Sequence, residues 1–134
     1  MRLARSGTAP EPGRVDVAGS DDHLILGPDR RFAYTPEPRA YPYRPGVDVF
    51  FESLAAAGTR PGVAVLLTGM GSDGARGLAR LRKLGWHTIA QDETSSVVYG
   101  MPRAAAELNA AVEVLPLEQI GAAVANRLRA QKQG

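Results

Sequence analysis

The sequence predicts an α/β fold in which helices cover both faces of a parallel sheet. The strongest signal is Val63–Leu67, a run of five apolar residues without a polar interruption. A short run of this kind, rich in β-branched residues, predicts a strand that is buried on both faces and central in its sheet. Candidate helices and strands then alternate to the end of the chain, as they do in parallel sheets.

Length and composition indicate one globular domain of 134 residues. Apolar residues make up 44% of the chain, which is enough for a core. No apolar run approaches the ~18 residues that indicate a membrane span, and no apolar signal segment follows Met1. The absence of cysteine excludes disulfides and thiolate metal sites, and a formal net charge of +2 gives no indication of nucleic acid. We therefore expect a cytoplasmic protein with no membrane insertion and no nucleic-acid partner.

The first third of the chain is predicted to hold a β-hairpin. Residues 1–13, taken alone, are small and polar and predict a flexible tail, and Val15–Ala18 predicts a short strand. Leu24–Leu26 and Phe32–Tyr34 flank the turn sequence G-P-D-R and predict the two hairpin strands. Four prolines within residues 35–46 then forbid a regular helix and predict an extended connection.

Two helices are predicted on either side of the central run. Apolar residues from Val47 onward recur at i, i+3, i+4 and i+7, and Gly58 is a plausible end for this helix. The next helix covers about Gly74–Leu84, with Leu78 and Leu81 facing inward.

Two further strands and two further helices complete the predicted fold. Thr88–Ala90 predicts a strand, residues 91–100 a polar loop, and Pro102 the start of a short helix. Val112–Leu115 predicts the last strand, and Pro116 opens the last helix. The residues of that helix predicted to face inward are Leu117, Ile120, Val124 and Leu128.

A glycine-rich turn follows the central run and opens the next helix, where ligands of open α/β sheets collect. It fits the dinucleotide-binding pattern G-x-G-x-x-G, and Asp92 and Glu93 stand near the ~20-residue spacing of a ribose-binding acid. Asp73 counts against this hypothesis, because a carboxylate there would repel an incoming pyrophosphate. The structural alternative is that the glycines only allow a tight turn and close helix packing. The three glycines are Gly69, Gly71 and Gly74.

The same turn also supports a hydrolase hypothesis. A buried aspartate at a strand end, such as Asp73, can hold a histidine in the tautomer that a serine nucleophile requires. The backbone N–H groups of the turn could help to bind an oxyanion.

Four stretches resemble the C-terminal part of the CheB-type chemotaxis protein-glutamate methylesterases. Within residues 66–85, Thr68–Gly74 matches the family's T-G-M-G-x-D-G. Residues 90–102 are similar to A-Q-[DN]-E-x-x-S-x-V-x-x-M-P, and residues 44–51 to R-P-S-V-D-V-L-F. Residues 11–24 resemble P-G-x-V-Y-I-A-P-x-D-x-H-L, with glycine in place of the second proline. The resemblance covers about residues 2–129 and leaves 130–134 as a tail.

The resemblance implies a Rossmann-like, three-layer α/β esterase domain with a β-hairpin excursion and a serine–histidine–aspartate triad. Such enzymes hydrolyse glutamate γ-methyl esters on chemoreceptors, and many members deamidate glutamines, with no cofactor or metal. Asp73 matches the triad aspartate, and the backbone near Met70 would lie by the oxyanion. The family's nucleophile lies in G-x-S-x-G-G and its histidine in Q-H-M, and neither motif occurs in this sequence.

These departures imply a catalytic domain that is incomplete at its N-terminus and inactive alone. Its expected partners are methylated chemoreceptor segments and an upstream or separate segment that carries the serine and the histidine. A non-catalytic remnant that only binds receptor or partner domains is the alternative from another class, and a dinucleotide-binding domain is the second alternative.

Other polar residues have simpler structural explanations. Ser72 adjoins Asp73, but neighbours in a turn point apart. Ser95 and Ser96 are expected to bond local backbone. His23 matches a family histidine outside the triad.

His87 and Trp86 are expected to pack at the start of a strand. The basic residues of the 74–84 helix predict a solvated face, and docking of acidic receptor segments is the alternative. These residues are Arg76, Arg80 and Lys83.

Overall fold

The chain divides into two compact units, each described here by itself. The computed structural model describes residues 1–133, with side chains through Gln131. The first unit is Met1–Thr59, and the second begins at Arg60.

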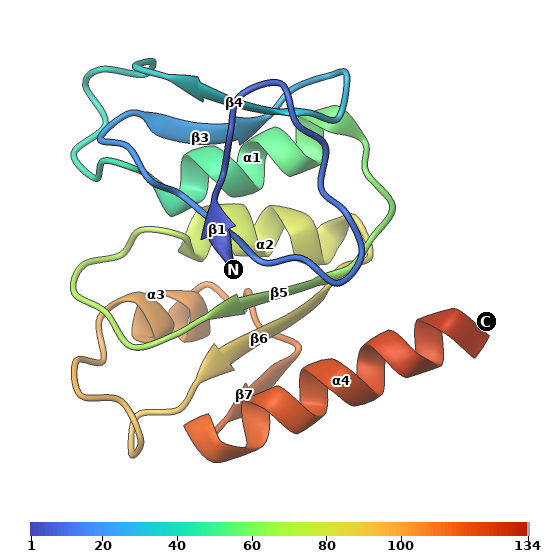
Figure 1. The fold of residues 1–134 in the computed structure, drawn as a ribbon. Coiled ribbons are helices and arrows are strands. Elements are labelled where there is room, and N and C mark those ends of the chain that lie inside the picture. The colour runs from blue at the N-terminus through green and yellow to red at the C-terminus, as the bar shows by residue number, and fades with distance from the viewer. Residues whose placement is uncertain (134) are drawn as a thin grey trace. The chain divides into compact units, whose positions relative to one another are not determined.

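The first unit contains four short strands and one helix (Figure 1). Strand β1 (Arg2–Leu3) pairs in parallel with β2 (Asp16–Val17). Strands β3 (His23–Leu26) and β4 (Phe32–Thr35) form the predicted antiparallel hairpin, with Leu26 opposite Phe32. Helix α1 (Val47–Ala57) packs against β3.

The hairpin and α1 share one apolar core. Each element turns one apolar face toward this core, and that face is the periodic pattern seen in the sequence. Leu24 and Leu26 alternate with Ile25 along β3, so their side chains lie on the same face. That face is buried, and the apolar stripe of α1 lies against it. The buried members of the core are Ala4, Leu24, Leu26 and Phe32, with Tyr34, Phe50, Leu54 and Ala57 packed against them.

The prediction of a flexible tail for residues 1–13 is wrong. Gly7 N donates to Phe32 O, and Phe32 N donates to Thr8 O, both at 2.8 Å, which holds the N-terminal segment beside β4. The carboxylate of Asp16 accepts hydrogen bonds from Arg2 Nε at 3.3 Å and from Arg14 Nε at 3.0 Å. Arg2 lies far from Asp16 in sequence, and Gly7 lies far from Phe32, so local composition could not reveal these contacts.

The same ion pairs affect the titration of Asp16. Desolvation by itself raises the pKa of its carboxyl group. The hydrogen bonds and charges of Arg14 and Arg2 outweigh that effect and lower the pKa below the ordinary value.

The second unit is built on a parallel sheet of three strands. Strands β5 (Val63–Leu66), β6 (His87–Gln91) and β7 (Glu113–Leu115) lie in the order β5-β6-β7. The register pairs Leu66 with Ala90 and Gln91 with Leu115. The carboxyl ends of the three strands therefore lie at the same edge of the sheet.

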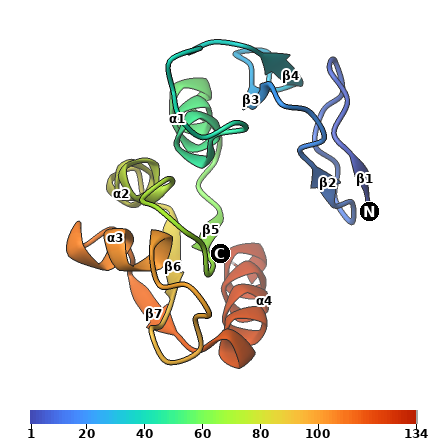
Figure 2. The same cartoon turned by 90° about the vertical axis from the view of Figure 1, so that its left-hand side faces the viewer.

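Three helices cover this sheet and give the unit three layers. Helices α2 (Ala75–Lys83) and α3 (Met101–Glu107) lie beside one another on one face, and α4 (Leu117–Gln133) lies on the other (Figure 2). Leu78 and Leu81 lie on the inward face of α2 and are fully buried, as the helical pattern predicts. None of the described helices combines the length and the hydropathy of a membrane span.

Two details of the second unit differ from the sequence predictions. Within residues 1–133, β6 has a neighbour on each side, and one edge of β5 is unpaired. Ala64 and Leu66 of β5 are buried, whereas Val63 and Val65 are only half-buried. The apolar run alone does not show that both faces of the strand are fully buried in this chain.

Helix α4 is the other difference. Of the residues predicted to face inward, Ile120 is buried, but Leu117 and Leu128 are about half exposed. The helix continues through Gln133, so it includes most of the segment that the resemblance leaves as a tail.

We expect Leu78→Ala to lower the free energy of unfolding by about 2–5 kcal/mol, because a fully buried leucine leaves a cavity. Leu84, which is 50% exposed at the end of α2, gives the matched control Leu84→Ala with a far smaller effect. Urea denaturation followed by circular dichroism measures both changes. Equal losses of stability in the two variants would contradict the packing described for α2.

Candidate active site

The loop between β5 and α2 carries the residue to which the sequence assigns chemistry. Asp73 lies in this loop, at the carboxyl end of the sheet, and is only 4% exposed. Gly71 and Gly74 adopt φ values of 86° and 94°, in the left-handed region that favours glycine. Gly74 is also the N-cap of α2, so the helix begins two residues after the aspartate. The glycines thus allow the tight turn that places a buried carboxylate at the strand end.

A second loop, residues 92–100 after β6, is docked onto the first. Gly69 N donates to Val98 O at 3.0 Å, and Met101 N donates back to Gly69 O at 2.9 Å. The Thr68 hydroxyl donates to Val98 O at 2.9 Å and accepts from Val98 N at 2.8 Å. A Cβ at Gly100 would lie 2.6 Å from Gly69 O, a distance that real Cβ atoms do not reach. Only glycine allows this close approach.

Gln91, the last residue of β6, joins the two loops through its buried amide. Its Oε1 accepts a hydrogen bond from Thr68 N at 2.7 Å. Its Nε2 donates to Ser95 O at 2.8 Å and lies 3.2 Å from Ser95 Oγ. Sequence analysis used Gln91 only as part of a motif and missed this bridge. The available signal was a polar residue directly after the apolar pair Ile89 and Ala90.

Asp92 closes the turn that Gln91 holds. Its Oδ1 accepts hydrogen bonds from Ser95 N at 2.9 Å and from Ser95 Oγ at 2.6 Å. These bonds stabilise the carboxylate and lower the pKa of Asp92. Ser95 Oγ also accepts from Leu117 N at 3.0 Å, which ties the turn to the start of α4. The hydrogen bonds hold Asp92, the candidate ribose-binding acid, within its own loop.

The predicted site residues differ in their exposure to solvent. Met70 is in the same loop as Asp73 but is 80% exposed, whereas Asp73 is buried. Ser72 is exposed between them. Glu93, the other candidate acid, is exposed in the second loop.

The two histidines of the chain have structural roles. His23 is fully buried in the first unit, where its Nδ1 accepts from Gly46 N at 2.9 Å. Because Nδ1 accepts, Nε2 carries the proton and donates to Pro38 O at 3.2 Å. His87 lies at the start of β6, the opposite end of the strand from Gln91, and its Nε2 is 2.7 Å from Glu113 Oε2.

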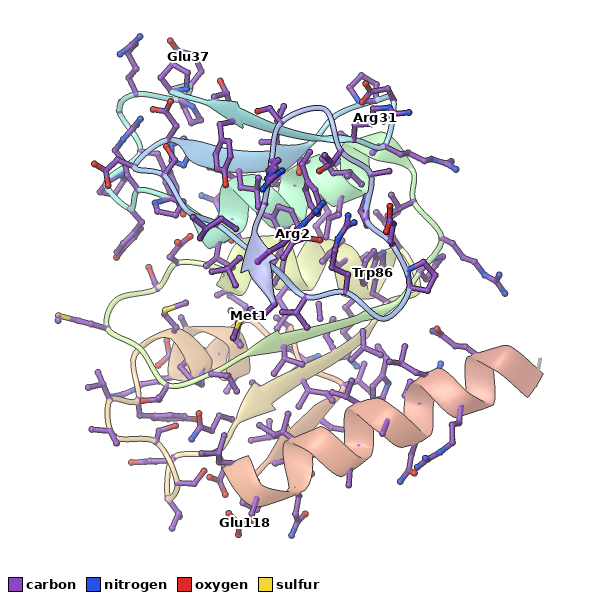
Figure 3. The ribbon with its side chains drawn as sticks, viewed as in Figure 1. Met1, Arg2, Arg31, Glu37, Trp86 and Glu118 are labelled. Atoms are coloured by element: carbon purple, nitrogen blue, oxygen red, sulfur yellow. The ribbon has the colours of Figure 1, made fainter. Side chains whose placement is uncertain are left out.

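Ser96 and Trp86 contact residues nearby in the second unit. Ser96 Oγ donates to Asp92 O at 2.6 Å, which confirms the expected backbone bond. Trp86, labelled in Figure 3, packs over Gly62, where a Cβ would lie 3.3 Å from its ring. Among the described residues, no three His, Asp or Glu side chains gather closely enough to hold a metal ion.

We expect Gln91→Leu to loosen the contact between the loops, because it leaves Thr68 N without its acceptor. The cost is about 0.5–1.5 kcal/mol, the net contribution of one hydrogen bond, because Thr68 is exposed and water can reach its amide. Hydrogen exchange at the Thr68 amide should accelerate by about tenfold or more. The control Gln119→Leu alters an exposed residue of α4 and should leave that amide unchanged. Unaltered exchange at Thr68 in Gln91→Leu would show that the bridge contributes nothing.

A second prediction concerns pH. Folding lowers the pKa of Asp92 below its ordinary 3.8, so the hydrogen bonds from Ser95 stabilise the turn at neutral pH. That stabilisation is lost as the pH falls through the lowered pKa. The Ser95 amide resonance should therefore titrate with a midpoint below 3.8 and should not titrate in Asp92→Asn. A midpoint above that value would contradict the hydrogen-bonded turn.

Comparisons with known proteins identify the family of the chain. The family model described as CheB methylesterase matches residues 1–124. The chain is 54% identical over 120 residues to protein-glutamate methylesterase/protein-glutamine glutaminase 2 of Cupriavidus metallidurans, covering 90% of this chain and 36% of that protein. It is 52% identical over 120 residues to protein-glutamate methylesterase/protein-glutamine glutaminase 3 of Pseudomonas aeruginosa, again covering 90% of this chain and 36% of that protein. The chain thus spans little more than a third of the length of these curated relatives.

A solved structure gives the same result for the fold. The crystal structure of the Thermotoga maritima CheB methylesterase catalytic domain matches with a TM-score of 0.83 and 33% identity. The match covers 91% of this chain and 66% of that one. The T-G-M-G-x-D-G stretch, the α/β fold and the family model lead to one conclusion: this chain belongs to the CheB methylesterase family.

Proposed function

We propose that this chain supplies the aspartate-bearing part of a protein-glutamate methylesterase. The observation that carries the proposal is Asp73, a buried carboxylate held at the carboxyl end of a parallel sheet. Relatives of more than 50% identity are named protein-glutamate methylesterase/protein-glutamine glutaminase. The substrates are then glutamate γ-methyl esters on the cytoplasmic segments of chemoreceptors, with glutamine side-chain amides as a second class.

The proposed reaction is acyl transfer. A serine hydroxyl attacks the ester carbonyl while a histidine takes its proton, methanol leaves, and water hydrolyses the acyl-enzyme. Asp73 accepts a hydrogen bond from the histidine Nδ1–H, which fixes the tautomer and stabilises the imidazolium. The loop backbone beside the exposed Met70 is the proposed place for an oxyanion donor.

The serine and the histidine of this triad come from a segment other than these 134 residues. Neither G-x-S-x-G-G nor Q-H-M occurs in the sequence. His23 is held by Gly46 and Pro38, and His87 lies next to Glu113. The chain corresponds to part of a catalytic domain, and we place its action in the cytoplasm, where the receptor segments lie.

A hybrid enzyme tests this proposal. The residues of the Thermotoga catalytic domain that have no counterpart here are fused ahead of this chain, and methanol release from methylated receptor is measured. The hybrid should be active, whereas this chain alone should release no methanol above background. If a folded hybrid binds receptor but is inactive, the chain is a non-catalytic binding remnant.

In the active hybrid, Asp73→Asn should lower turnover by about 10⁴-fold, the loss known for the same change in a serine protease triad. The histidine would then lack the carboxylate that orients it. Glu93→Gln, an exposed change in the neighbouring loop, is the matched control and should retain full turnover. Near-parental turnover in Asp73→Asn would refute the role given to Asp73.

A further inference from the structure

A hollow of about 610 Å³ lies along helix α2 and the C-terminal end of α3 in the second unit. Figure 2 shows these two helices on the same face of the sheet. The lining is basic, small or apolar, without an acidic or aromatic side chain. The lining residues are Arg76, Ala79, Arg82, Lys83, Leu108 and Asn109.

The basic charge of this hollow is not balanced within its unit. Residues 74–91 contain no aspartate or glutamate. Among the described residues of the second unit, no carboxylate forms an ion pair with Arg76, Arg82 or Lys83. The three cations therefore present positive charge to whatever enters the hollow.

Arg82 is held in position by neutral acceptors. Its Nη1 donates to Asn109 O at 2.9 Å and to Ala111 O at 3.1 Å. Carbonyl oxygens fix the guanidinium but do not neutralise it. Leu108, which is 51% exposed, adds an apolar contact beside this fixed charge.

Helix stability explains only part of this pattern. Cations in the last turn of a helix interact favourably with its dipole, which accounts for Arg82 and Lys83. Arg76 is in the first turn of α2, where a cation faces the positive end of the dipole and is unfavourable. Its position needs another reason, and a bound anion supplies one.

We propose that this hollow is a docking surface for an acidic polypeptide segment. Arg76 and Lys83 are separated by seven positions on one helix, a rise of about 10 Å. The segment that fits carries two carboxylates at about that separation, with an apolar side chain between them for Leu108. A nucleic acid fits less well, because the lining offers no aromatic ring on which a base could stack. The inference is independent of the proposed esterase activity.

Peptide binding to the chain tests the proposal. The probe is a fluorescent peptide of about 12 residues with two glutamates flanking one leucine, followed by anisotropy at low salt, where charge pairing is strongest. Arg76→Glu with Lys83→Glu should weaken binding by about tenfold or more. The milder pair Arg76→Gln with Lys83→Gln should weaken it by about threefold and guards against misfolding of the reversed pair.

The control reverses two exposed charges elsewhere in the unit. Arg60→Glu with Arg129→Glu changes the net charge equally and should alter binding by less than about twofold. If peptide binding weakens equally in this control, the effect comes from overall net charge and not from the hollow, and the proposal is overturned. Absence of binding, equal binding of a peptide with glutamine for glutamate, or tighter binding of a single-stranded DNA oligomer at the same surface would overturn it as well.

Discussion

The docking of the loop after β6 onto the loop after β5 is the constraint on which the candidate site depends. The Gln91 amide bridges the two loops, and the Thr68 hydroxyl exchanges two hydrogen bonds with Val98. Gly100 lies so close to Gly69 O that no side chain fits there. Each of these contacts joins the ends of neighbouring strands, so the parallel sheet itself determines the position of the loop that holds Asp73.

The residues that hold the two loops together are not the residues to which the sequence assigns chemistry. Gln91, Asp92 and Ser95 form a hydrogen-bonded frame behind the glycine loop. The buried Asp73 and the exposed Met70 lie on the loop that this frame supports. A triad requires its carboxylate to be fixed before the histidine arrives, because orientation of the imidazole is the contribution that the carboxylate makes. If Asp73 is the triad carboxylate, this frame supports its loop through the hydrogen bond from Thr68 to Gln91.

Sequence patterns predicted the elements whose partners are close in sequence or whose periodicity is strong. The hairpin, the helix that buries Leu78, and the glycine turn at Asp73 are examples. Patterns failed where long-range pairing decides the structure. Gly7 is hydrogen-bonded to Phe32 although its segment reads as a tail, and the bridge made by Gln91 depends on two loops that only the sheet brings together.

The most direct test of the central claim is the proton resonance of the histidine in the active hybrid. If Asp73 is the triad carboxylate, the Nδ1–H of that imidazole donates to it and resonates far downfield. The account predicts that this signal is present in the hybrid and absent from the same protein with Asp73→Asn. A downfield Nδ1–H signal that persists unchanged after the substitution would show that another group holds the histidine, and would contradict the account.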